Sequence, residues 1–141
     1  MARISVLAAA ALASLSLTGF AHAEGNLAAN GEDLPELQIN TIDLTYSQTE
    51  YQLETGQYYH LEITSDGNEE VAWMSPELFR NSWVNQIVIN DLEIKSYGVY
   101  SFEWDDAGTI SFSFVPLRPG EYEFFTPGYE DRGLRGKFVV N

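Results

Sequence analysis

The chain has 141 residues, no cysteine, and seven Lys and Arg residues against 21 Asp and Glu residues, which gives a formal net charge of −14. The missing cysteines exclude disulfides, thiolate metal ligands and a cysteine nucleophile. The charge disfavours nucleic acid as a partner and favours basic partners or cations, although such a charge also serves simply to keep an exported protein soluble.

The N-terminus has the pattern of a secretory signal peptide. Met1-Ala2-Arg3 gives a positive start, residues 4–20 are apolar or small, and Ala21-His22-Ala23 fits an A-x-A cleavage site. The uninterrupted apolar core of this segment is shorter than the roughly 20 residues that a membrane-spanning helix needs. We therefore expect residues 1–23 to be removed, and the mature protein to be exported to the periplasm without a membrane span.

Residues 24–36 are small, polar and acidic, which predicts a flexible N-terminal arm before a single domain at 37–141. In that domain short β-rich runs alternate with turn signals about every ten residues, which is typical of an all-β sandwich. The expected strand regions are 39–44, 51–53, 59–63, 71–74, 84–89, 92–94, 99–104, 109–115, 122–125 and 137–140. Tyr59, Leu61 and Ile63 should share one face of their strand, with His60 and Glu62 on the other.

Ser75 followed by Pro76 is a helix-start signal, so one short helical turn is predicted near Pro76–Asn81. No longer segment shows the helical period. The domain is therefore expected to be all-β apart from this turn.

The C-terminal segment 120–140 resembles the last hairpin of a cupredoxin, the family of blue-copper proteins. That pattern is Pro-Gly-x-Tyr, then Cys, two residues, His, four residues, Met, x-Gly and an apolar strand; here Thr126, Tyr129 and Leu134 stand in the Cys, His and Met places. Residues 51–63 and 114–122 are similar to earlier parts of the family pattern. The resemblance covers approximately 39–140 and implies a Greek-key β-sandwich of the cupredoxin type.

The same resemblance places the remaining copper ligand, a histidine, within one or two residues of Val71. A type 1 copper site needs two imidazoles, a thiolate and a weak axial thioether. Val71, Thr126, Tyr129 and Leu134 supply none of these donors, so we expect the fold without copper and without another cofactor. The retained spacing has two explanations. Either Tyr129 and Leu134 fill the vacated site with apolar bulk, or the end that cupredoxins present to redox partners has become a protein-binding face.

Two further groups of residues suggest binding. Arg132, Arg135 and Lys137 form a small basic group beside this loop, which either pairs with nearby carboxylates or forms a docking surface for an acidic partner. His60 and Glu62 share a strand face and could hold a cation; the alternative is a histidine that faces water on an acidic surface.

Catalytic motifs give little support for an enzyme. The sequence contains no Gly-x-Ser-x-Gly turn and no phosphate-cradling glycine loop, and paired carboxylates alone leave a hydrolase only as a third hypothesis. We expect a non-enzymatic binding or accessory protein for a periplasmic metal or redox system, with another periplasmic protein as its partner. The alternative is a cation-binding protein that uses surface carboxylates and His60.

Overall fold

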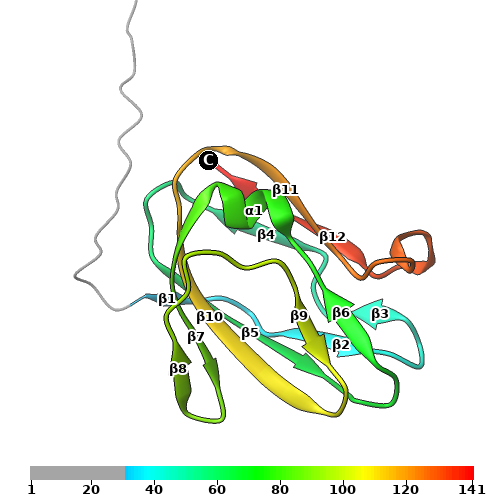
Figure 1. Cartoon of the computed structure of the whole chain (residues 1–141). Helices are drawn as coiled ribbons and strands as arrows, with labels where there is room; N and C mark the ends of the chain where they lie inside the picture. The colour runs from blue at the N-terminus through cyan, green and yellow to red at the C-terminus, as the bar shows by residue number, and fades with distance from the viewer. Residues whose placement is uncertain (1–30) are drawn as a thin grey trace, which may run out of the picture.

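The computed structural model describes residues 31–141 (Figure 1). The predicted signal peptide and the arm up to residue 30 lie outside the described residues. Within the described part, no helix is long and apolar enough to cross a membrane.

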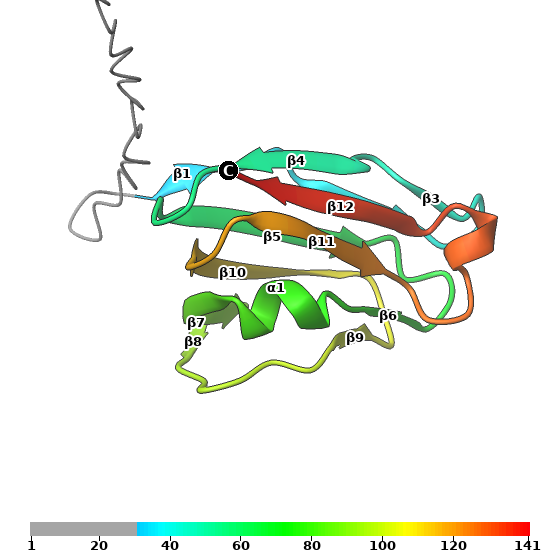
Figure 2. The same cartoon turned by 90° about the horizontal axis from the view of Figure 1, so that it is seen from above.

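Most of the chain is arranged in a two-layer β-sandwich (Figures 1 and 2). The larger layer is a seven-stranded sheet in the order β3-β2-β5-β10-β7-β8, with β1 also paired to β5. Its strands are β1 (Glu32–Asp33), β2 (Leu37–Asn40), β3 (Thr45–Tyr46), β5 (Tyr59–Ser65), β7 (Ser82–Ile89), β8 (Leu92–Ile94) and β10 (Gly108–Pro116).

The second layer contains a three-stranded sheet in the order β11-β12-β4 and the pair β6-β9. A backbone bridge between Met74 and Phe125 joins the two. The strands are β4 (Glu50–Leu53), β6 (Val71–Trp73), β9 (Phe102–Trp104), β11 (Gly120–Phe125) and β12 (Arg135–Val140). β12 lies antiparallel to β11 and parallel to β4. The described chain is therefore an all-β sandwich with one short helix, as predicted.

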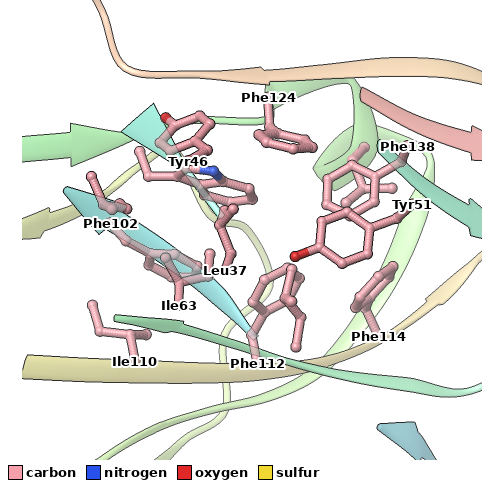
Figure 3. Packing of buried hydrophobic residues seen from close by; sticks show 14 of the residues in the cluster. Leu37, Tyr46, Tyr51, Ile63, Phe102, Ile110, Phe112, Phe114, Phe124 and Phe138 are labelled. Atoms are coloured by element: carbon pink, nitrogen blue, oxygen red, sulfur yellow. The ribbon is translucent and has the colours of Figure 1, made fainter. Parts of the chain in front are cut away.

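The alternation of side chains along the central strands builds the core. In β5, Tyr59, Leu61 and Ile63 are buried, while His60 and Glu62 lie on the opposite face. Phe112 and Phe114 of the neighbouring β10 face the same interior, as Figure 3 shows. Each such side chain stabilises the fold by about 1.5–3 kcal/mol when fully buried.

Aromatic rings fill the space between the layers. Trp73 is fully buried, stacks on Phe102 with ring centroids 6.0 Å apart, and also contacts rings of β10, β11 and β12. Four aromatic side chains of the described residues depart from this pattern: Trp83, Tyr97, Tyr100 and Tyr129 are exposed. Because the chain has no cysteine, no disulfide links the two layers, and the packing of the buried rings holds them together.

The predicted helical turn is present as α1 (Pro76–Arg80), with Pro76 at its first position. Ser75 does not cap it through its side chain. Its Oγ donates instead to the carbonyl oxygen of Glu123 at 2.8 Å, which ties the start of the helix to β11. The Ser75-Pro76 signal therefore predicted the start of the helix correctly, although Ser75 acts by bonding to β11 and not by capping the helix.

Two strand predictions were too long. The run 39–44 ends at Asn40, because the Asn40 Oδ1 accepts hydrogen bonds from the N–H groups of Ile42 and Asp43 and turns the chain. Leu44 then takes a left-handed φ of 54°. The run 99–104 becomes a strand only at Phe102.

Residues 31–36 of the predicted arm fall within the described part. The N–H of Glu32 donates to Tyr58 O at 2.8 Å and the N–H of Leu34 donates to His60 O at 2.9 Å, so β1 lies parallel to β5. Leu34 is half-buried against the core. Flexibility of the arm over 24–36 stays a prediction.

Candidate functional site

One end of the sandwich, which we call the tip, is closed by the loop 126–134 between β11 and β12. Backbone hydrogen bonds within the loop hold it together: Thr126 N donates to Leu134 O at 3.0 Å, and Leu134 N donates to Tyr129 O at 3.2 Å. Between them lies a 3₁₀ turn, η1 (Glu130–Arg132), which ends at Gly133 with a left-handed φ of 116°. The retained loop spacing thus builds a compact, self-bonded loop.

Leu134 closes the interior of the tip with hydrocarbon. Its side chain is 1% exposed and belongs to the core, together with Val71 at 6%. Two of the positions that the cupredoxin pattern gives to metal ligands are therefore core positions here. That Leu134 fills a vacated metal site stays a prediction.

Thr126 is also buried, and its hydroxyl is engaged. Thr126 Oγ1 lies 2.8 Å from the hydroxyl of Tyr46, which is buried in the same place. Burial raises the pKa of Tyr46 well above its usual value, and the hydrogen bond between Tyr46 and Thr126 only partly opposes this. The pair is neutral, with each hydroxyl satisfied by the other.

Tyr129 does not fill the interior, so that part of the prediction was wrong. Its side chain is 39% exposed, and the guanidinium carbon of Arg132 lies 5.4 Å from its ring centroid. The turn from Thr126 to Tyr129, followed by η1, carries the tyrosine to the rim of the tip. An exposed cation–π contact of this kind contributes about 0.5–1 kcal/mol.

A pocket of about 240 Å³ opens at the tip; we call it the tip pocket. It is lined by three of the four predicted ligand positions, by the 41–44 turn, by Glu69 and Glu70, and by Arg132. Its lining is thus apolar at Val71 and Leu134, anionic on one wall and cationic at Arg132. Sequence reasoning missed the walls at 41–44 and 69–70, because these segments are distant from the loop in the chain.

Asp66 holds the 41–44 wall in place. Its carboxylate accepts hydrogen bonds from Thr41 N at 3.0 Å and from Thr41 Oγ1 at 2.6 Å, and the N–H of Glu69 donates to the same hydroxyl at 3.2 Å. The hydrogen bond from the Thr41 hydroxyl is the main cause of a lowered pKa at Asp66. The two chain segments that form the wall are therefore fixed to each other.

The three basic residues differ in what they contact. Arg135 pairs with Glu123 at 2.6 Å, and Lys137 lies 3.2 Å from Glu121 and 3.6 Å from Glu50, all across the three-stranded sheet. The hydrogen bond to Glu121 raises the pKa of Lys137. Arg132 lines the tip pocket. A docking role for Arg132, Arg135 and Lys137 stays a prediction.

His60 and Glu62 lie on the outer face of the larger sheet, as expected, and line a second pocket with Asp33 and Glu36. His60 is half-buried, because Gly31 lies against its ring and its Nδ1 is 2.5 Å from the hydroxyl of Ser113. Among residues 31–141 no three His, Cys, Asp or Glu side chains are arranged to hold a metal ion.

No family model matches the chain, and no curated protein matches it. Among solved structures, it is similar to a multicopper oxidase (8% identity, 78% of this chain, 44% of that chain, TM-score 0.60) and to a multicopper oxidase from Campylobacter jejuni (8%, 79%, 30%, 0.56). A sodium-dithionite-reduced auracyanin from Roseiflexus castenholzii aligns at 16% identity over 80% of this chain and 98% of its own, with a TM-score of 0.49.

The chain spans less than half the length of the two oxidases it matches. At 8% identity the likeness is one of fold alone. The two layers, their strand order and the likeness to the two oxidases support the predicted cupredoxin-like β-sandwich as the fold of this chain.

Proposed function

We propose that this protein is an exported, non-enzymatic binding or accessory protein of a periplasmic metal or redox system, and that its tip pocket docks another periplasmic protein. One observation carries the proposal. Val71, Thr126, Tyr129 and Leu134 gather at the tip without a metal-binding donor set, and three of them line a pocket of about 240 Å³.

The residues at the tip do not fit type 1 copper. Val71 and Leu134 carry no donor atom, and the Thr126 hydroxyl is a hard oxygen that is already bonded to Tyr46. A thiolate and two imidazoles would be needed in their place. We therefore derive no electron transfer through copper for this chain.

The tip pocket has the character of a protein-docking surface. Interfaces combine an apolar centre with a polar rim, and Tyr and Arg are enriched at the residues that contribute most to binding. Here Ile42 is 68% exposed, Tyr129 is 39% exposed, and both border the pocket beside Arg132. A partner that inserts an apolar side chain between Glu69–Glu70 and Arg132 would meet this pattern.

A photo-crosslinking residue in place of Ile42 tests the proposal in the native compartment. The matched control is the same residue in place of Leu117, which is 57% exposed at the opposite end of β11. We expect a defined crosslinked protein from position 42 and none from position 117. Equal products from both positions, or none from position 42, would contradict docking at the tip.

Calorimetric titration with copper, zinc, iron and calcium separates this proposal from the cation-binding alternative. We expect no stoichiometric binding at micromolar affinity. Binding at that affinity that disappears in the His60→Ala and Glu62→Gln variants would instead support the alternative, because both side chains line the same outer-face pocket.

A further inference from the structure

The free edge of the larger sheet, at β8, is independent of the tip pocket. β8 pairs with β7 on one side, and no other strand of residues 31–141 pairs with its outer side (Figure 1). All three residues of β8 are exposed, with Leu92 at 70% and Ile94 at 45%. An exposed edge that carries apolar side chains is a template for pairing with another strand.

The turn before β8 determines which of its backbone groups face outward. Asn90 and Asp91 have φ values of 49° and 64°, which are those of a type I′ turn, and Ile89 pairs with Leu92 across it. Residues of an antiparallel ladder turn their N–H and C=O groups alternately toward and away from the partner. Leu92 and Ile94 therefore bond toward β7, and Glu93 presents its backbone groups to solvent. The same alternation, continued one residue past the end of β8, turns the backbone groups of Lys95 outward.

The charges on these outward residues select one register for pairing with an identical strand. If Glu93 faces Glu93, or Lys95 faces Lys95, like charges lie directly opposite, which is destabilising. If the two-fold axis passes through Ile94, Glu93 of each copy faces Lys95 of the other. The register that satisfies the backbone is then also the one that pairs opposite charges twice.

We propose that β8 pairs antiparallel with β8 of a second copy of this chain about a two-fold axis at Ile94, so that the larger sheet continues across a dimer. Ile94 pairs with the buried Ile87 within its own hairpin, so it lies on the core side of the sheet. At the axis it meets its equivalent, and both lose exposed apolar surface. Glu93 and Lys95 already lie on one face, since their charged atoms are 3.4 Å apart.

The net charge of −14 on each copy opposes association at long range. At roughly 150 mM salt the screening length is about 8 Å, so this repulsion is reduced while contacting charges still interact. We therefore expect a weak, reversible dimer under these conditions.

Sedimentation equilibrium of the full mature chain at this salt concentration, from micromolar to millimolar protein, tests the proposal. We expect a concentration-dependent dimer for the parent. Glu93→Lys and Lys95→Glu should each be monomeric, because each places like charges opposite across the axis. Mixed in equal amounts, they should form a heterodimer, because two basic residues of one copy then face two acidic residues of the other. The double variant Glu93→Lys, Lys95→Glu should dimerise like the parent.

Glu103→Lys, an exposed change of the same charge on β9, is the control and should dimerise like the parent. A parent that stays monomeric at millimolar concentration overturns the proposal. So does a mixture of the two single variants that fails to associate, or single variants that dimerise as well as the parent.

Discussion

At the scale of single residues, Leu134 places hydrocarbon where the cupredoxin pattern has Met. Because the side chain is 1% exposed, Leu134→Ala should leave a cavity and lower the free energy of unfolding by about 2–5 kcal/mol. Urea unfolding measures the change. Leu117→Ala, at a position that is 57% exposed, is the control and should change stability by less than about 0.5 kcal/mol. Equal midpoints for the two variants would contradict the role of Leu134 in closing the tip.

The hydroxyl pair beneath the tip pocket is expected to behave as a unit. Thr126→Val leaves the buried Tyr46 hydroxyl without its partner at 2.8 Å and should cost about 1–3 kcal/mol of stability. Tyr46→Phe should cost a similar amount. The double variant should be less destabilised than the sum of the two, because both polar groups are then removed. Strictly additive unfolding energies would show that the two hydroxyls are not coupled.

The stability of the folded protein should depend on pH through Asp66, which holds one wall of the tip pocket. Its pKa in the folded state lies below the unfolded value of 3.8, so its contribution to stability is present above that value and is lost as the pH falls through the folded pKa. Asp66→Asn should therefore be less stable than the parent at neutral pH, and the difference should shrink below about pH 4. Urea unfolding at a series of pH values measures it, and a difference that grows on acidification would be the wrong sign.

At the scale of elements, β12 depends on close backbone packing at Gly136. A Cβ there would lie 2.3 Å from Phe124 Cζ and 2.6 Å from Thr49 O, so Gly136→Ala should force β12 away from its neighbours and cost about 1–3 kcal/mol. Gly98 has no atom within 4 Å of the equivalent position, and Gly98→Ala is the control. Thermal unfolding compares the two, and an equal loss in both would contradict packing as the cause.

The elements that the sequence predicted well are those with a strong local pattern. The alternation in 59–63 and 109–115 and the Ser75-Pro76 signal located β5, β10 and α1. β1 and β3 were missed, because each has only two residues and is defined by pairing with a distant strand. η1 was missed as well, although acidic residues at its start and Gly133 at its end are helix signals.

The site was predicted only in part for the same reason. The spacing of Thr126 and Leu134 fixed their places in one loop, and both are buried at the tip. The spacing of residues in the sequence does not determine how a loop turns, so it gave the wrong position for Tyr129. The turn at 126–129 and η1 place this side chain at the rim of the tip. The 41–44 and 69–70 walls come from other parts of the chain and depend on the tertiary contact between Thr41 and Asp66.

At the scale of the whole molecule, the proposed export has a direct test. Cleavage after Ala21-His22-Ala23 should give a mature chain that begins at Glu24 and is released with the periplasmic fraction. Intact-mass measurement of protein made from the full-length gene checks this. A product that keeps Met1 and stays with the cytoplasm would contradict export.

The position of β12 also limits the order in which the molecule folds. Among residues 31–141, β4 pairs only with β12, and the N–H of Asn141 donates a further hydrogen bond to Leu53 O at 2.9 Å. Residues near 50 therefore complete their pairing only when residues near 140 are available. A polypeptide that emerges from a ribosome or a translocation channel N-terminus first cannot complete this layer until β12 has emerged. Pairing between segments as far apart in the sequence as β4 and β12 slows folding. It would keep a nascent chain in an unfolded, threadable state, which suits the export route proposed above.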